Sequence, residues 1–373
     1  MRSCCRYLVA ENAGPVSDLA RRRTGTSEIE TRVRKAWTGE SGLGFRVAST
    51  LYGLGHDVRN LLYDAGILES RGMPIPVISV GGLTTGGSGK TPVSAAVAGW
   101  LVEGGRRPAV ITGGIPDEAA VHRMLNPDLT VIDLRDRRSA VLGALQAGAG
   151  VAVLDSGFQH RRVRSELQIL CVDVHSALLP GRRRLPEGPF RDRWSALERA
   201  DAVVLVRREV GASSLGRESE SQTLLAEIGS AAPGVLACSC FVRPTGIRAA
   251  NAVAEGITPS DGAAAVAGVM WPESFFDALD ELGVSVSSRL TFRDHEPYAP
   301  RQLETIRAAA AGGIVCTLKD AVKLGPLLAD DVPVWYLEEE AAWESGETRL
   351  RRGVLRTAVV PQIRGQVDTV QGE

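Results

Sequence analysis

Two adjacent residues, Lys90 and Thr91, could together hold a nucleotide. They end the segment 75–91, IPVISVGGLTTGGSGKT, after a run of glycines and hydroxyl residues. Glycines allow backbone N–H groups to turn inward around phosphates, the lysine reaches the β- and γ-phosphates, and the threonine hydroxyl can bind Mg²⁺. The alternative is a flexible glycine turn, but only four of the 43 Lys and Arg residues are Lys, and one of them stands here.

The residues on either side of this loop predict the elements that hold it. Residues 77–80 form a mostly β-branched run that indicates a buried strand, and Val93, Val97 and Trp100 recur at helical spacing. The order strand, glycine-rich loop, helix places the phosphates at the start of the helix, where free N–H groups and the helix dipole favour an anion. Thr84 stands where the first glycine of the usual pattern belongs, so the match is not literal.

A carboxylate is predicted beside this loop. Four apolar residues, 151–154, run directly into Asp155, as expected for a buried strand with an acid at its tip. In phosphate-loop proteins such an acid holds Mg²⁺ directly or through water, so Thr91 and Asp155 are the predicted metal ligands. His160, in the segment that follows, could orient Asp155 or a substrate group, or make a structural hydrogen bond within its loop.

Transfer of a phosphate to a hydroxyl also needs a base. The candidates are Asp117, which follows the second predicted strand, and His295, in the segment FRDHEPY. A carboxylate and an imidazole can take a hydroxyl proton together, with the carboxylate fixing the tautomer of the ring. The two residues lie in different predicted domains, so their cooperation requires a site in the cleft between domains and a closure that excludes water.

Composition excludes several classes of protein. The net charge of −1 gives no reason to expect nucleic-acid binding. The six cysteines lack the spacing of a metal site and are expected to be reduced and to fill the core. No apolar run approaches the length of about 18 residues that a membrane span needs, and the first residues lack the apolar region of a signal peptide.

Alternating strand and helix patterns predict an α/β protein: a phosphate-loop NTPase-like, mostly parallel sheet flanked by helices, with a smaller α/β C-terminal domain. Proline and glycine loosen the pattern at 242–262, where a domain boundary is expected. Beyond the loop, the predicted strands are 108–112, 129–133, 151–155, 169–174, 202–206, 235–241, 264–269, 284–292, 313–317 and 334–337, and the helices are 117–125, 137–146, 273–282, 301–311 and 319–328. The predicted parts are a poorly ordered extension 1–40, an amphipathic helix 41–70, a phosphate-loop core 71–245 and the C-terminal domain 246–373.

Residues 44–63 predict an amphipathic helix. Val47, Leu51 and Leu54 belong to one apolar stripe, and polar residues such as Asp57 and Asn60 take the other side. Two interpretations are open: the stripe packs on the protein core, or it contacts a membrane surface.

Five segments resemble the tetraacyldisaccharide 4'-kinases, the lipid A 4'-kinase family. They are PVISVGGLTTGGSGKTP, LDSGFQHRRVRSELQIL, LPEGPFRDRWSALERADAVV, FRDHEPY and TLKDAVKL, and their order and spacing agree with the family over residues 40–340. The resemblance implies transfer of the γ-phosphate of ATP to the 4'-hydroxyl of a tetraacylated glucosamine disaccharide 1-phosphate, with Mg²⁺. It also implies peripheral binding to the cytoplasmic face of the inner membrane, and therefore favours membrane contact for the helix at 44–63.

The resemblance also assigns site residues. It places the proposed base on Asp117, its partner on His295 and the metal-binding acid on Asp155. The ATP loop falls on Thr84, Thr85, Gly86, Gly87, Ser88, Gly89, Lys90 and Thr91. Arginines suited to the sugar phosphate or to lipid head groups, or else to a solvated surface, are Arg161, Arg162, Arg164, Arg182, Arg183, Arg184, Arg191 and Arg193.

Several positions depart from the family pattern. Ser156 follows Asp155 where a second aspartate is usual, the stretch 112–117 is shortened, and Gly82, Glu296 and Leu318 replace an asparagine, a histidine and an acid. These departures keep a second hypothesis open, a nucleotide-binding homologue with weakened catalysis and a regulatory or scaffold role. A different phosphate-loop ATPase or GTPase is less favoured, because no N-K-x-D-like motif for guanine is present.

Overall fold

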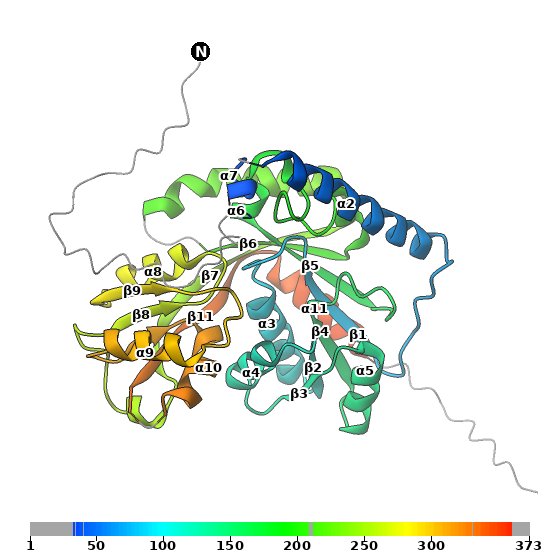
Figure 1. The fold of residues 1–373 in the computed structure, drawn as a ribbon. Helices are drawn as coiled ribbons and strands as arrows, with labels where there is room; N and C mark the ends of the chain where they lie inside the picture. The colour runs from blue at the N-terminus through cyan, green and yellow to red at the C-terminus, as the bar shows by residue number, and fades with distance from the viewer. Residues whose placement is uncertain (1–32, 34, 40, 209–211, 330, 360–373) are drawn as a thin grey trace, which may run out of the picture.

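The computed structural model describes residues 33–359, with the exception of 34, 40, 209–211 and 330 (Figure 1). Most of the predicted extension 1–40 therefore lies outside the described residues. Ala36 and Trp37, at its end, are buried, and the indole nitrogen of Trp37 donates a hydrogen bond of 3.1 Å to the carbonyl oxygen of Pro186.

One sheet of eleven strands runs through the molecule, in the order β3-β2-β4-β1-β5-β6-β7-β11-β10-β8-β9. All neighbouring strands are parallel except β7 and β11, which pair antiparallel and join the larger part of the sheet to the smaller part (Figure 1). This architecture confirms the predicted α/β fold with a mostly parallel sheet. The strands are β1 (Val77–Gly82), β2 (Pro108–Thr112), β3 (Thr130–Asp133), β4 (Val151–Asp155), β5 (Leu167–Asp173), β6 (Ala202–Arg207), β7 (Leu236–Ala249), β8 (Ala264–Ala267), β9 (Ser288–Thr291), β10 (Ile314–Cys316) and β11 (Val334–Ser345).

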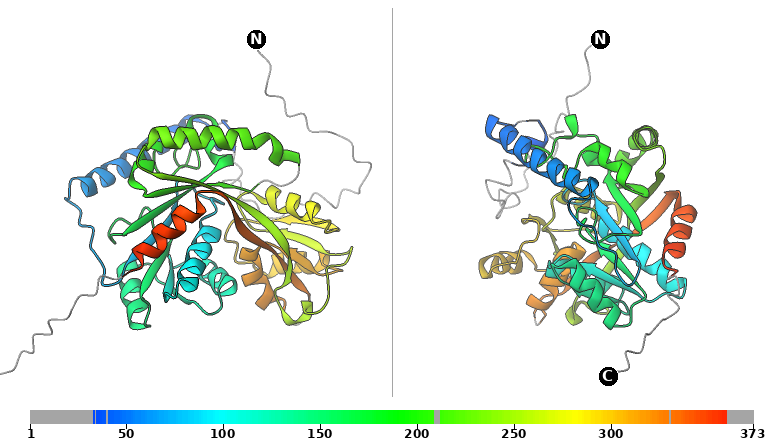
Figure 2. Two further views of the ribbon diagram at one scale, coloured as in Figure 1. Left: turned by 180° about the vertical axis from the view of Figure 1, so that it is seen from behind. Right: turned by 90° about the vertical axis from the view of Figure 1, so that its right-hand side faces the viewer.

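Helices cover both faces of the sheet (Figure 2). In the larger part, α3 and α11 bury apolar side chains against one face, while α5, α6 and α7 pack on the other. In the smaller part, α8 covers one face and α9 and α10 cover the opposite one. The helices are α2 (Leu43–Asp64), α3 (Lys90–Glu103), α4 (Pro116–Leu125), α5 (Arg137–Gln146), α6 (Val174–Ala177), α7 (Ala212–Ala231), α8 (Pro272–Glu281), α9 (Pro300–Ala309), α10 (Leu318–Leu327) and α11 (Glu347–Thr357), with short 3₁₀ helices η2 (Pro180–Arg182), η3 (Trp194–Arg199) and η4 (Ala252–Ala254).

The observed elements differ from the predicted ones at the join between the two parts. Strand β7 continues to Ala249 through Pro244, where we predicted a loosened boundary, because the proline sits at a register shift opposite Glu338 and Glu339 of β11. Strand β11 continues to Ser345, well past the predicted end at residue 337. Helices α7 and α11 were not predicted.

Helix α2 lies across the outside of the molecule with its apolar stripe facing outward. Leu51, Leu54 and Leu61 are 64%, 60% and 66% exposed. The interpretation that this stripe packs on the core is therefore wrong: the side that faces the protein is the polar one. Among the helices that the structure describes, none is long and apolar enough to span a bilayer.

Candidate functional site

The glycine-rich loop connects the central strand β1 to helix α3. Gly86, Gly87 and Gly89 have φ angles of 70°, 65° and 73°, in the left-handed region that glycine adopts without strain. A Cβ atom on Gly89 would lie 2.5 Å from a methyl carbon of Val206 on β6, so this position also needs glycine for close approach. The loop therefore has the local geometry that the sequence predicts for a phosphate cradle.

The lysine of the loop points back across it. The Nζ atom of Lys90 donates a hydrogen bond of 2.8 Å to Ser88 Oγ, which keeps the charge at the loop where phosphates would bind. Desolvation, together with the nearby Arg191 guanidinium, lowers the pKa of Lys90. The negative charge of a bound polyphosphate would offset both effects. Arg191 also donates a hydrogen bond of 3.4 Å to Thr85 Oγ1 of the same loop.

Asp155 lies beside the loop because β4 pairs with β1 and brings Asp155 opposite Val80. Thr91 Oγ1 donates a hydrogen bond of 3.3 Å to Asp155 Oδ2, so the two predicted metal ligands are adjacent. Burial raises the pKa of Asp155, but hydrogen bonds from His122 and Thr91 and the charge of Lys90 outweigh it and hold the pKa below its usual value. A hydroxyl and an ionised carboxylate are oxygen donors that suit Mg²⁺, with phosphate oxygens and water completing its coordination.

The metal site contains few acids. Within the described part of the chain, no group of three or more His, Cys, Asp or Glu side chains could hold a metal ion. Ser156, at φ 60°, follows Asp155, and its Oγ atom lies 3.5 Å from Asp155 Oδ1. The ring in contact with Asp155 belongs to His122, at 2.8 Å, whereas His160, which we considered for this role, is exposed.

Asp117 and His295 meet in the structure. Asp117 is in the first turn of α4 and His295 is in the loop after β9, and His295 Nδ1 lies 2.7 Å from Asp117 Oδ2. Lys323, from α10, places Nζ 3.9 Å from the same oxygen. Burial raises the pKa of Asp117, but the His295 hydrogen bond and the Lys323 charge outweigh burial, so that the pKa lies below its usual value. An ionised carboxylate braced by an imidazole can accept a proton.

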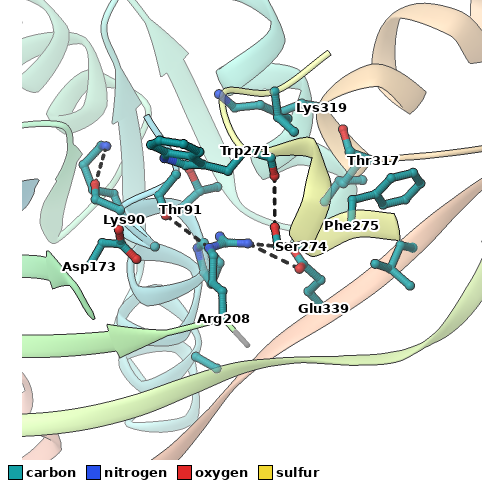
Figure 3. A pocket seen from close by; sticks show the side chains of 18 of the residues that line it. Lys90, Thr91, Asp173, Arg208, Trp271, Ser274, Phe275, Thr317, Lys319 and Glu339 are labelled. Atoms are coloured by element: carbon teal, nitrogen blue, oxygen red, sulfur yellow. Dashed lines mark hydrogen bonds and ion pairs between the residues drawn. The ribbon is translucent and has the colours of Figure 1, made fainter. Parts of the chain in front are cut away.

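A cavity of about 760 Å³ opens between the larger and smaller parts of the sheet (Figure 3). The phosphate loop forms one wall, and Trp271, Lys319 and Glu339 belong to the other. Arg208 crosses between the walls, with Nε 3.1 Å from the carbonyl oxygen of Gly87 and Nη1 3.3 Å from Glu339. The site is therefore built from both parts of the molecule, and it is large enough for a nucleotide.

Most of the predicted arginine cluster serves the structure. Arg184 donates to the carbonyl oxygen of Gly53 at 2.9 Å and to Asp57 Oδ1 at 2.8 Å, which attaches α2 to the rest of the protein. Among the described residues, Arg191 is the member of the cluster that hydrogen bonds the phosphate loop. Those with a carboxylate partner are Arg161, Arg164, Arg182, Arg183, Arg184 and Arg193.

The fold and the site together define a phosphate-loop phosphotransferase. The central strand of a mostly parallel α/β sheet enters a glycine-rich loop with a lysine, and the neighbouring strand ends in an acid. The aspartate–histidine pair lies next to Glu118 and Asp294, which line the cavity. The profile described as Tetraacyldisaccharide-1-P 4'-kinase matches residues 43–358. The chain belongs to this family, as the resemblance of its motifs predicts.

Curated relatives and a solved structure agree with this assignment. The chain is 34% identical over 321 residues to the tetraacyldisaccharide 4'-kinase of Geobacter sulfurreducens, covering 79% of this chain and 87% of the relative. It is also 34% identical over 323 residues to that of Halorhodospira halophila, covering 81% and 90%. A crystal structure of LpxK from Aquifex aeolicus, an "apo" form in complex with ATP, superposes with a TM-score of 0.62 at 25% identity, covering 83% of this chain and 97% of that one.

Proposed function

We propose that this chain transfers the γ-phosphate of ATP to the 4'-hydroxyl of a tetraacylated glucosamine disaccharide 1-phosphate, a precursor of lipid A. Family membership over residues 43–358 supports the reaction. The main structural support is the contact of 2.7 Å between Asp117 and His295. It lies beside a cavity that the phosphate loop lines.

Each group has a part in this reaction. Lys90, Arg191 and the backbone N–H groups of the loop hold the triphosphate, and Thr91 and Asp155 would hold Mg²⁺. When bound, Mg²⁺ neutralises charge on the phosphates. As the sugar oxygen forms its bond to the γ-phosphorus, the bond from that phosphorus to ADP breaks, and Asp117 takes the hydroxyl proton.

The histidine keeps Asp117 ready for this transfer. His295 donates through Nδ1, so the ring holds the carboxylate in one orientation and stabilises its ionised form. Helix α10 of the smaller part packs against α4, which carries Asp117. The contact between Asp117 and His295 therefore depends on the packing of the smaller part of the molecule against the larger part. The proposed base and its partner thus come from different parts of the molecule.

The acceptor is a lipid, and α2 offers a surface for it. We propose that the exposed apolar stripe of α2 inserts into the head-group region of the inner membrane, on its cytoplasmic face, and holds the enzyme there peripherally. Leu51 and Leu54 would lie in the apolar boundary, while Asp57 and its partner Arg184 stay on the protein side.

A transfer assay tests the reaction. Radiolabelled γ-phosphate should appear on the disaccharide lipid in detergent with Mg²⁺-ATP. Lys90→Ala should lower the rate about 100- to 1,000-fold because one electrostatic contact to the phosphates is lost, and Asp117→Asn about 100- to 10,000-fold because the base is lost. Lys35→Ala, at an exposed lysine that does not line the cavity, is the matched control and should not change the rate. Full activity in Lys90→Ala, or no transfer by the unaltered protein, would reject the proposed function.

A further inference from the structure

The interior of the site contains a histidine that the reaction described above does not use. His122 is on α4, and its side chain is fully buried. Its Nε2 atom lies 2.8 Å from Asp155 Oδ2, and its Nδ1 atom is buried without a hydrogen-bond partner in the described part of the chain. Because a carboxylate oxygen accepts hydrogen bonds, Nε2 carries the proton and donates it to Asp155.

The acid nearest in space to Asp155 comes from α4, and the next residue along the chain carries no charge: Glu118 lines the cavity, and the charge of Asp155 helps to raise its pKa. The family pattern expects a second aspartate at position 156, and this chain has serine there. The Ser156 hydroxyl lies 3.5 Å from Asp155 Oδ1, at the limit of a hydrogen bond, and it carries no charge that could bind a cation. A single carboxylate that can rotate about its χ angles is a weaker metal ligand than one held in place by a hydrogen bond.

Helix α4 couples His122 to the base. The helix begins with Asp117 in its first turn and carries His122 near its last turn, where the ring reaches Asp155 at the tip of β4. Helix α4 therefore fixes the position of Asp117, the proposed base, relative to Asp155, the proposed metal-binding carboxylate.

We propose that His122 is a positioning residue for the metal site: its Nε2–H holds the Asp155 carboxylate in the orientation that binds the divalent cation, and so compensates for the missing second carboxylate at Ser156. This inference rests on the proposed function, since Asp155 is a metal ligand only if the chain binds Mg²⁺-ATP. Hydrogen-bond donors behind a metal ligand typically change metal affinity by about 10- to 100-fold.

Mn²⁺ binding measures this role without turnover. The full chain is saturated with a non-hydrolysable ATP analogue and titrated with Mn²⁺, and free Mn²⁺ is followed by its electron paramagnetic resonance signal. We expect His122→Leu to weaken Mn²⁺ binding about 10- to 100-fold, while affinity for the analogue without metal changes less than about 3-fold. His122→Gln, whose amide nitrogen can take the place of Nε2, should stay within about 5-fold of the unaltered chain.

A matched control separates positioning from general stability. Tyr298 is a buried residue in the smaller part of the molecule, and its hydroxyl donates a hydrogen bond of 2.7 Å to Asp320 Oδ1. Tyr298→Phe removes a buried hydrogen bond to a carboxylate and should lower thermal stability while leaving Mn²⁺ affinity unchanged. Unchanged Mn²⁺ affinity in His122→Leu, or equal losses in His122→Leu and Tyr298→Phe, would overturn the proposal. If the leucine variant does not fold, His122→Asn, whose amide is too short to reach Asp155, replaces it.

Restoring the second acid gives an independent check. Ser156 has a φ of 60°, a conformation that aspartate tolerates better than most residues, so Ser156→Asp should fold. We expect this substitution to recover at least about 10-fold of the Mn²⁺ affinity lost in His122→Leu. No recovery in the double variant would show that His122 does not compensate for the second acid. Phosphate transfer by the unaltered chain is measured separately, so failure of the proposed function is recognised independently of the Mn²⁺ result.

Discussion

Replacing the outward leucines of α2 tests how this protein meets its lipid substrate. Leu51, Leu54 and Leu61 are 64%, 60% and 66% exposed. Burying a whole leucine side chain contributes about 2 kcal/mol, so moving the exposed part of each into lipid contributes about 1.2 kcal/mol, and the three together almost 4 kcal/mol. Since about 1.4 kcal/mol corresponds to a factor of ten, the triple change to serine should weaken vesicle binding by two to three orders of magnitude.

Sedimentation with vesicles of phosphatidylethanolamine and phosphatidylglycerol measures this binding. The matched control is the triple serine variant of Leu134, Leu142 and Leu145, exposed leucines in or just before α5, which lies well away from α2 (Figure 1). Because all six side chains are exposed, both variants should keep the thermal stability of the unaltered chain within about 0.5 kcal/mol per substitution. Equal vesicle binding by the two variants, or a large loss of stability confined to the α2 variant, would refute the membrane-facing assignment.

Two further substitutions probe contacts that hold the site together. Gly53→Ala would place a methyl group against the Arg184 guanidinium and break its hydrogen bonds to α2, so the free energy of unfolding measured in urea should fall by about 1–2 kcal/mol. Gly55→Ala, on the same helix, is the control: its methyl group meets open space, and it should raise the free energy of unfolding by up to about 1 kcal/mol. Lys323→Met removes a positive charge 3.9 Å from Asp117, so the pKa of Asp117 should rise. The acidic limb of the pH profile of kcat/KM should then move to higher pH, and a limb that does not move would contradict this role of Lys323.

Local patterns in the sequence predict the strands and helix around the phosphate loop well. Each pattern and the element that it predicts cover the same short stretch of residues. Strands β2 and β4 begin and end where predicted, since continuous apolar runs mark strands buried on both faces. Helices α7 and α11 were missed because their apolar positions are few. The signal was nevertheless present: Leu224 and Ile228 on α7, and Leu350 and Val354 on α11, are buried and four residues apart.

Contacts between distant segments limit how much of the site could be predicted. Thr91 and Asp155 were predicted together because, in phosphate-loop proteins, an acid at the end of a neighbouring strand lies close to the loop and helps to hold Mg²⁺. The partner of Asp155 was not, since His122 is 33 residues away and only the packing of α4 on the sheet brings it near. Arg191 was predicted among eight arginines, but its neighbours in sequence do not distinguish it from Arg184, which has a structural role.

The orientation of α2 on the protein surface could not be predicted from the sequence either. An amphipathic pattern identifies an apolar and a polar face, but it does not show which of them is buried against the protein. The neighbouring loop decides it: the protein side of α2 carries Asp57, which pairs with Arg184, and Asn60, which donates to Asp192 at 3.0 Å. Charged groups can be buried in this way because each has a partner, and the apolar stripe is left to face outward.

The loop beneath α2 also reaches the active site. The backbone N–H of Thr85 in the phosphate loop donates to the carbonyl oxygen of Pro189 at 2.8 Å, and that of Arg191 donates to the carbonyl oxygen of Leu83 at 2.9 Å. One short loop therefore bonds to the proposed membrane helix on one side and to the phosphate loop on the other. With α2 bound to the membrane as we propose, this connection would hold the phosphate loop at a fixed height above the lipid surface, so that the sugar head group, rather than the whole lipid, would have to move to meet it.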